Sequence, residues 1–230
     1  MEKVTWGIIG CGDVCERKSS PAMYKPEDSR LWAVMRRDRD KLEDFARRHG
    51  VPKTYTEASL LIADPAVDIV YIATPPDTHM KYTLQALAGG KHVYVEKPMA
   101  MDYAQCIRMN EAARESGKKL FVAYYRRSLD YFLKVKRLLD EASIGNILSV
   151  VVRFTRAPLT GDLDRDNLPW RLRRETGGEG YFYDLAPHTL DILDFLLGEI
   201  EHAKGFNANR AGYYEVPDTV AAAFRFRSGI

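Results

Sequence analysis

Near the start of the chain a short, largely apolar run leads directly into a glycine-rich turn, and this junction constrains the fold more than any other feature. The run is Val4–Ile9, and Gly10-Cys11-Gly12 follows it at once. An apolar run of this length predicts a buried strand. A glycine turn between a strand and a helical pattern is typical of a dinucleotide-binding unit. An ordinary strand-to-helix turn is the alternative interpretation.

Each residue of the turn has a separate expected part in holding a diphosphate. Gly10 permits the tight turn, and Gly12 lets the pyrophosphate approach the backbone. The helix that begins at Asp13 and Val14 offers unpaired N–H groups and the positive end of its dipole. The turn therefore predicts a binding site for a nicotinamide dinucleotide.

The rest of the first 125 residues alternates short apolar runs with helical patterns. Such alternation predicts a parallel sheet that is covered on both faces and has right-handed crossovers. We therefore expect residues 1–125 to form a doubly wound α/β domain, the Rossmann type. The expected strands are Val4–Ile9, Leu31–Met35, Asp68–Ala73, His92–Val95 and Leu120–Ala123, and the expected helices are Asp38–His49, Thr78–Ala88 and Asp102–Ser116.

The end of the second expected strand indicates which dinucleotide is bound. About 20 residues after such a turn, an acidic residue selects the ribose hydroxyls of NAD, whereas an arginine accommodates the extra phosphate of NADP. Here the strand ends in Arg36 and Arg37, and guanidinium groups bind phosphate but offer a ribose diol no acceptor. The sequence favours NADP over NAD. The alternative is that both arginines form a solvated basic corner and that Asp38 takes the ribose.

Past Tyr125 the pattern changes, and we expect a second domain over residues 126–230. A basic helix, a long strand and an irregular charged stretch precede a strongly apolar helix, and two further strands follow it. These segments are expected at 129–139 for the basic helix and at 146–155, 203–208 and 218–227 for the strands. The last strand alternates so that Val220, Ala222, Phe224 and Phe226 face inward. The final residues 228–230 resemble the start of a hairpin turn, so we expect this domain to be incomplete.

Composition narrows the classes of partner. The 34 basic and 32 acidic residues give a formal net charge of +2, so no global field directs the chain toward nucleic acid or an anionic membrane. The first apolar run is too short for a signal peptide or a membrane span. The cysteines Cys11, Cys15 and Cys106 are odd in number and lack metal-type spacing, which fits a reducing cytoplasm. The expected partners are small molecules or protein.

Three further motifs occur in order along the chain. They are Ala73-Thr-Pro-Pro-Asp-Thr-His79, Gly90-Lys-His-Val-Tyr-Val-Glu-Lys-Pro98 and Gly177-Gly-Glu-Gly-Tyr-Phe-Tyr-Asp-Leu-Ala-Pro-His188. Together with the glycine turn, they resemble the Gfo/Idh/MocA oxidoreductases, the family of glucose-fructose oxidoreductase and inositol dehydrogenase. The resemblance implies a Rossmann domain followed by an α+β domain with a large, open, mainly antiparallel sheet, which often mediates homo-oligomerisation. Members are usually longer than this chain, and Glu179 stands within what is usually a run of glycines.

The resemblance also implies which residues contact the cofactor beyond the glycine turn and the arginines. They belong to the two motif turns and are Thr74, Pro75, Pro76, His79, Glu96 and Lys97.

Lys97 is the first expected catalytic residue. It follows the fifth expected strand, and ligands collect at the carboxyl ends of parallel strands in such folds. An ammonium near a nicotinamide can polarise a carbonyl or stabilise an alkoxide, and the resemblance implies this role for Lys97. A cis bond before Pro98 would fix the turn. The alternative is an ordinary surface ion pair between Glu96 and Lys97.

Asp184, His188 and Asp191 fall on one face of the apolar helix because their spacings are four and three. His188 can exchange a proton with a substrate hydroxyl near neutral pH, and Asp184 can orient its ring. The resemblance implies that both join Lys97 in the active site. The alternative is that His188 only forms a local hydrogen bond with the Asp184 carboxylate and has no catalytic role. No metal site is predicted, since no cysteine or second histidine lies at ligand spacing nearby.

Two short stretches near the domain junction are candidates for stacking and hydrogen bonding to a polyol substrate. They are Tyr124-Tyr125-Arg126-Arg127 and Trp170-Arg171, and the alternative for these aromatic-rich stretches is packing. The expected substrate-binding residues within them are Tyr125, Arg126, Trp170 and Arg171.

These observations predict an NAD(P)-dependent oxidoreductase that transfers a hydride between the nicotinamide and a carbinol or carbonyl carbon of a sugar, polyol or cyclic diol. Two alternatives stay open. One is an NAD-dependent glycosidase, in which transient oxidation drives elimination. The other is a non-enzymatic dinucleotide-binding module or sensor with a shortened substrate domain.

Overall fold

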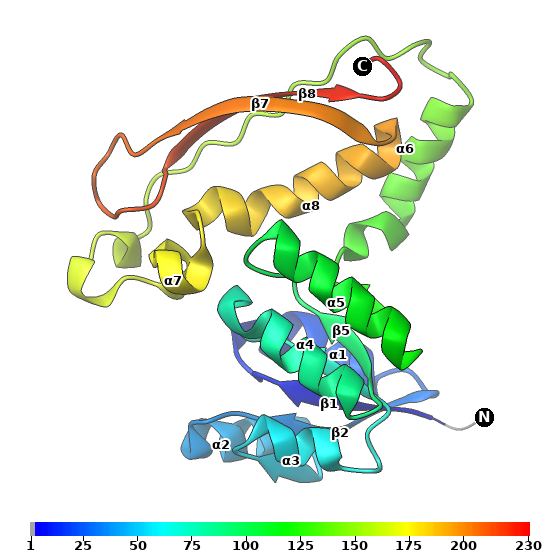
Figure 1. The fold of residues 1–230 in the computed structure, drawn as a ribbon, viewed down its shortest axis with the longest axis vertical. Helices are drawn as coiled ribbons and strands as arrows, with labels where there is room; N and C mark the ends of the chain where they lie inside the picture. Colours follow the sequence, from blue (N-terminus) through cyan, green and yellow to red (C-terminus); the bar gives the residue numbers. More distant parts are fainter. Residues whose placement is uncertain (1–2) are drawn as a thin grey trace. The chain divides into compact units, whose positions relative to one another are not determined.

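The computed structural model describes residues 3–230, and the chain divides into two compact units between Ala123 and Tyr124. This division falls just before the boundary expected at residue 125. Figure 1 shows the fold of each unit, with the first in blue to green and the second in green to red.

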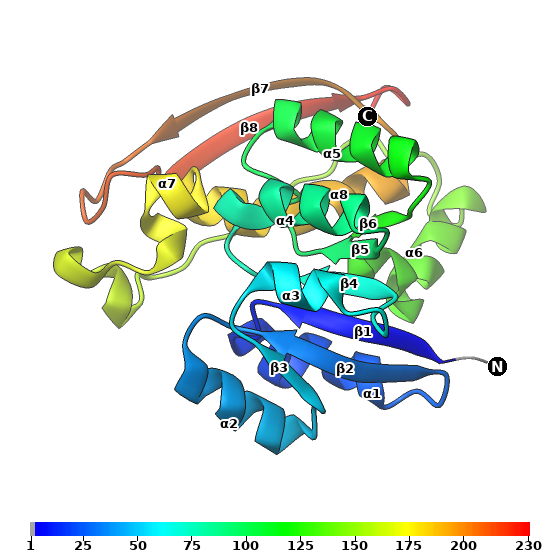
Figure 2. The same cartoon turned by 60° about the horizontal axis from the view of Figure 1, so that its bottom comes forward.

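The first unit is built on a six-stranded parallel sheet with strand order β3-β2-β1-β4-β5-β6. Figure 2 shows β3, β2, β1 and β4 side by side. The order reverses at β1, so the turn after β1 lies at the switch point where such sheets bind ligands. The strands are β1 (Val4–Ile9), β2 (Ser29–Met35), β3 (Lys53–Tyr55), β4 (Ile69–Ile72), β5 (His92–Val95) and β6 (Leu120–Val122).

Helices cover both faces of this sheet, and their ends follow the sequence signals. Asp38 and Asp102 accept hydrogen bonds from backbone N–H groups three residues on, and Gly50 and Gly117 end the same two helices in the left-handed region. The helices are α1 (Pro21–Tyr24), α2 (Arg39–His49), α3 (Ala58–Ala63), α4 (His79–Ala88) and α5 (Tyr103–Ser116), with the single turns η1 (Cys15–Ser19) and η2 (Pro76–Thr78).

Neighbouring residues of the central strands point into two different apolar layers. Ile8 packs in one layer with Phe45 of α2, whereas Ile9 packs in the other with Leu87 of α4. All four residues of β4 are buried. A sheet buried on both faces is what continuous apolar strands predict, and the doubly wound fold is confirmed.

Two short elements carry too little sequence signal to be predicted. The strand β3 has three residues, two of them exposed, so it carries almost no apolar signal. The six-residue α3 is too short for a helical period to stand out, although it buries Ala58, Leu61 and Ile62 against the sheet.

The second unit combines helices with a two-stranded antiparallel sheet, in which β7 pairs with β8. Its main elements are α6 (Asp130–Asp140), α7 (Arg174–Gly177), α8 (Gly180–Leu197), β7 (Ile200–Ala208) and β8 (Thr219–Phe226). Four single turns complete it, namely η3 (Tyr125–Ser128), η4 (Thr160–Asp162), η5 (Arg165–Asn167) and η6 (Trp170–Leu172). Across residues 3–230, no helix has the length and apolarity that crossing a membrane requires.

One expectation for the second unit was wrong, and a second holds only in part. Residues 146–155 form no strand, and Figure 1 draws them as an extended thread. Their β-branched residues favour extended backbone, but a strand also needs a neighbour to receive its hydrogen bonds, and the structure pairs this segment with none. In β8 the inward alternation holds except at one position: Phe226 is buried and Val220 and Phe224 are half-buried, whereas Ala222 is exposed.

Candidate functional site

The turn after β1 depends on Gly10 for its shape. Gly10 has φ +90°, and its N–H donates to the carbonyl oxygen of Met35 at 2.9 Å. A Cβ placed on Gly10 would lie 2.7 Å from Cγ2 and 2.9 Å from the backbone nitrogen of Thr74. The absence of a side chain therefore brings the turn after β1 against the turn after β4.

Gly12 differs from Gly10 because no protein atom crowds it. Its nearest neighbour for an added Cβ is the Gly10 carbonyl oxygen at 4.0 Å. The helix starts directly after it, at Asp13 and Val14, and the first N–H groups of a helix lack intrahelical partners. An open glycine backbone at a helix N-terminus fits a diphosphate, so the residues present suit the dinucleotide.

Two buried thiols lie at the glycine turn: Cys11 is within it and Cys15 is in the helical turn that follows. The sulfur of Cys15 lies 3.8 Å from the carbonyl oxygen of Gly10. Burial raises the pKa of Cys11 to about 11 and raises that of Cys15 further. Both thiols are therefore neutral near pH 7, and Cys15 takes the position of the third small residue of the turn as a packed apolar side chain.

The end of β2 is fastened to the same turn. Nη1 of Arg36 donates to the carbonyl oxygen of Cys11 at 2.9 Å, and Arg37 is exposed beside it. The carboxylate of Asp38 caps α2 by accepting from the N–H of Lys41 at 3.1 Å, and this bond lowers the pKa of Asp38. The acidic side chain nearest to the arginines is thus already engaged with its own helix.

The turn after β4 contains the predicted residues Thr74, Pro75, Pro76 and His79. The hydroxyl of Thr78 lies 2.7 Å from that of Thr74. His79 is only 1% exposed, with Nε2 2.8 Å from the carbonyl oxygen of Thr74 and Nδ1 2.9 Å from that of Pro98. Burial lowers the pKa of His79. Its ring therefore ties this turn to the next one from inside the protein.

The turn after β5 carries Glu96, Lys97 and Pro98, and the Lys97–Pro98 peptide bond is cis. The phenol of Tyr71 donates to Oε1 of Glu96 at 2.5 Å. The other carboxylate oxygen of Glu96 accepts from the backbone N–H of Lys97 at 3.2 Å. Lys97 thus follows β5 at the carboxyl end of the sheet, on the edge that also carries the glycine turn.

In the second unit, α8 carries Asp184 and His188. Asp184 is 5% exposed, and its Oδ2 accepts from Nε of Arg171 at 2.7 Å. The guanidinium of Arg171 also lies 4.3 Å from the ring centre of Trp170. The two residues expected to bind substrate are therefore in contact with each other, and one of them holds the predicted catalytic carboxylate.

His188 lies against the tyrosines that open the second unit. The rings of Tyr124 and Tyr125 pack edge-on to it, with centroid distances of 6.2 and 5.3 Å. Nearby, Arg127 donates to Asp191 at 2.7 Å and lies 3.2 Å from Asp194, which fastens η3 to α8. The structure thus brings Tyr125 to His188.

The remaining predicted residues have simpler surroundings. Arg126 is half-buried in η3. Glu179 pairs with Arg174 at the surface. Sequence reasoning assigned no role to Tyr71 or Ser19, because an aromatic or hydroxyl residue within or beside an apolar run carries no separate signal.

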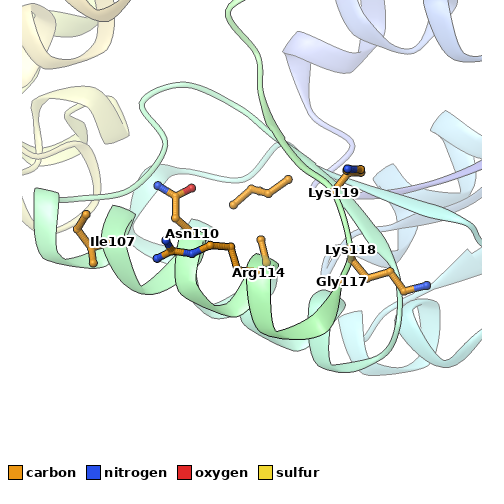
Figure 3. A pocket seen from close by; sticks show the side chains of 8 residues that line it. Ile107, Asn110, Arg114, Gly117, Lys118 and Lys119 are labelled. Atoms are coloured by element: carbon orange, nitrogen blue, oxygen red, sulfur yellow. The ribbon is translucent and has the colours of Figure 1, made fainter.

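A hollow of about 630 Å³ lies elsewhere on the first unit, beside α5 (Figure 3). Asn110, Arg114 and Lys119 are among its lining residues. It opens near the start of β6, whereas the glycine turn lies at the opposite, carboxyl edge of the sheet. None of the predicted site residues lines it.

Comparison with protein families covers nearly the whole chain. The oxidoreductase family with an NAD-binding Rossmann fold matches residues 4–124, and the GFO/IDH/MocA C-terminal domain matches residues 132–230. The chain belongs to the Gfo/Idh/MocA oxidoreductase family. Membership confirms the resemblance inferred from the motifs and the class of cofactor, a nicotinamide dinucleotide.

Individual Gfo/Idh/MocA relatives agree with this assignment. Oxidoreductase P35 of Formosa agariphila is 42% identical over 230 residues, covering 99% of this chain and 70% of the relative. The 1,5-anhydro-D-fructose reductase of Ensifer adhaerens is 30% identical over 232 residues, covering 98% of this chain and 66% of the relative. The structure of KijD10, a 3-ketoreductase from Actinomadura kijaniata in complex with NADP and TDP-benzene, matches with a TM-score of 0.86 at 27% identity. This match covers 100% of this chain and 68% of the KijD10 chain. This chain spans about two-thirds of the length of these proteins.

Proposed function

We propose that the protein is an NADP-dependent oxidoreductase acting on CH–OH groups. The observation that carries the proposal is the open backbone of Gly12, with the Arg36 guanidinium fastened to the adjoining Cys11 carbonyl. An arginine at this position supplies donors for the phosphate that distinguishes NADP from NAD. Asp38 is the competing candidate for a ribose partner, and its engagement with Lys41 argues against NAD.

When bound, the nicotinamide donates or accepts the hydride. The protein's own residues then have to manage the proton of the reacting hydroxyl. We assign Lys97 to polarise the substrate oxygen and His188 to exchange the proton. Asp184 accepts a hydrogen bond from Arg171, and we assign it to orient the ring of His188 and to stabilise the imidazolium that forms there.

The proposed substrate is a small polyhydroxylated molecule, that is, a sugar, polyol or cyclic diol. Support comes from the relatives, among them a 1,5-anhydro-D-fructose reductase and a 3-ketoreductase. Tyr125 contributes to this assignment because it lies against His188 and is 55% exposed, which leaves ring and hydroxyl available to a ligand.

The test is a turnover screen with the full chain. Sugars, inositols and dihydrodiols are supplied with NADP, and with NAD in parallel, and formation of the reduced cofactor is followed by absorbance. We expect stereospecific turnover that is faster with NADP. Lys97→Ala should abolish turnover while NADPH binding persists. Tight NADPH binding without turnover on any substrate would favour a dinucleotide sensor, and turnover of glycosides with no net reduction would favour a glycosidase.

We also propose that the protein is cytoplasmic and self-associates through its second unit. Cys11, Cys15 and Cys106 are all free thiols, as a reducing compartment favours. In the second unit Phe206 of β7 is 87% exposed and Val151 is 88% exposed. Val151 lies between Val150 and Val152, which are also exposed, and it is contiguous apolar surface rather than single residues that marks protein–protein interfaces. Sedimentation at increasing protein concentration tests self-association.

A further inference from the structure

A buried tyrosine lies below the turn that carries Lys97. Tyr71 is the third residue of β4 and is 0% exposed. A phenol hydroxyl inside an apolar sheet is costly unless it is hydrogen-bonded, so its partners reveal why it is tolerated there. Those partners are Oε1 of Glu96 at 2.5 Å and the hydroxyl of Ser19 at 2.8 Å.

The direction of these hydrogen bonds follows from the chemistry of the groups. A carboxylate accepts and cannot donate, so the single proton of the Tyr71 hydroxyl goes to Glu96. The hydroxyl of Ser19 must then donate to the phenol oxygen. Burial and the negative charge of Glu96 raise the pKa of Tyr71, so the phenol keeps its proton throughout the working pH range.

The chain of bonds continues to the backbone of Lys97. Oε2 of Glu96 accepts from the Lys97 N–H at 3.2 Å, while the Glu96 N–H donates to the Ile72 carbonyl oxygen at 2.9 Å. The carboxylate is thus held between the strand that carries Tyr71 and the first peptide of the turn. Ser19, at the other end, closes η1, which follows the glycine turn.

The ring of Tyr71 is itself fixed by packing. It faces Tyr94, its register partner on β5, with ring centroids 5.5 Å apart. Because the ring is held, the hydroxyl presents its proton in one direction, and Glu96 has one preferred position.

We infer that Tyr71 is a positioning residue: through Glu96 it sets the position of Lys97, and through Ser19 it links that turn to the helix after the glycine turn. The inference rests on the proposed function, since it gives Lys97 a reason to be held in place. The link joins the two segments of the first unit to which diphosphate binding and catalysis are assigned.

The charged state of Glu96 is central to this link. The titratable groups that feel its charge are Cys15, Tyr94 and His79, besides Tyr71. Burial raises the pKa values of Cys15 and Tyr94 and lowers that of His79, so these three are neutral near neutral pH. Removing the Tyr71 proton donor should therefore leave the Glu96 carboxylate with one hydrogen bond fewer and without a fixed position.

The test compares Tyr71→Phe with Tyr94→Phe in the full chain. Both variants keep the ring and lose one hydroxyl, but only the first removes the donor to Glu96. We expect Tyr71→Phe to lower kcat about tenfold, as loss of a hydrogen bond to a charged group would, with a small change in KM. Tyr94→Phe should match the parent chain in both kcat and KM, and Ser19→Ala should lower kcat by less than Tyr71→Phe does.

A second readout separates this inference from the proposed function. Carbon NMR of labelled glutamate reports the environment of the Glu96 carboxylate whether or not a substrate is known. A chemical-shift change at Glu96 in Tyr71→Phe that is absent in Tyr94→Phe supports the positioning role even if no turnover is found. Identical Glu96 chemical shifts in the two variants, or an unchanged kcat in an active Tyr71→Phe, overturns it.

Discussion

Alanine substitutions at Gly10 and Gly12 separate what the dinucleotide turn contributes to stability from what it contributes to ligand binding. Gly117, which lies outside the turn, is replaced by alanine as the reference for the backbone cost. At Gly117 φ is +66° and nothing lies within 4 Å of an added Cβ, so only the backbone cost of about 1–2 kcal/mol is expected. At Gly10 the φ of +90° is joined by a contact of 2.9 Å with the Thr74 backbone nitrogen, which cannot rotate away.

The magnitudes follow from these contacts. Overpacking adds about 1–3 kcal/mol, so Gly10→Ala should lose about 2–5 kcal/mol of unfolding free energy. Gly12→Ala should stay within about 0.5 kcal/mol of the parent chain, as is usual for sites without close contacts. In exchange, a methyl group at Gly12 occupies the space assigned to the diphosphate, and loss of one charge-assisted hydrogen bond weakens NADPH binding by about tenfold or more.

Urea unfolding measures the stabilities, and fluorescence titration with NADPH measures the affinities. From the most to the least stable, the expected order is Gly12→Ala, Gly117→Ala and Gly10→Ala. A Gly12→Ala protein that binds NADPH as tightly as the parent chain would contradict the assignment of the diphosphate to Gly12. A Gly12→Ala protein as unstable as Gly10→Ala would contradict the expected difference between the two glycines.

Three further predictions concern charged side chains. The Arg48 guanidinium lowers the pKa of Glu16 from 4.5 to about 2. The stability that this ion pair contributes is therefore present above pH 4.5 and is lost as the pH falls toward 2. In urea unfolding, the loss of unfolding free energy in Glu16→Gln relative to the parent chain should shrink over that range, and a constant loss would contradict this. Arg171→Ala should lower kcat more than it raises KM, because Arg171 holds Asp184 in place. A change confined to KM would instead support the prediction that Arg171 contacts the substrate. Arg37→Asp should weaken NADPH binding about tenfold or more and leave NADH within about threefold in fluorescence titrations, whereas equal losses would argue against a phosphate contact.

The first unit was predictable because each of its signals is local. The run before Gly10, the caps at Asp38 and Asp102 and the glycines after α2 and α5 act within a few residues, so sequence spacing is enough to place them. The same locality explains why the turns with Thr74 and Lys97 fall at strand ends.

Long-range contacts account for what the sequence did not show. Tyr71 meets Glu96 across 25 positions, and nothing in an apolar run distinguishes a tyrosine that donates to a carboxylate from one that only packs. Arg171 was assigned to the substrate because its type suits a polyol, whereas its partner is Asp184. The strand expected at 146–155 failed for a related reason: β propensity is local, but pairing requires a second segment.

The most direct test of the account is a crystal structure of the full chain with NADPH bound. We expect the diphosphate over the backbone of Gly12 at the start of the helix, the additional phosphate against Arg36 or Arg37, and the nicotinamide beside the turn that carries Lys97. Electron density for the dinucleotide in the hollow beside α5, or a diphosphate away from residues 10–14, would contradict it.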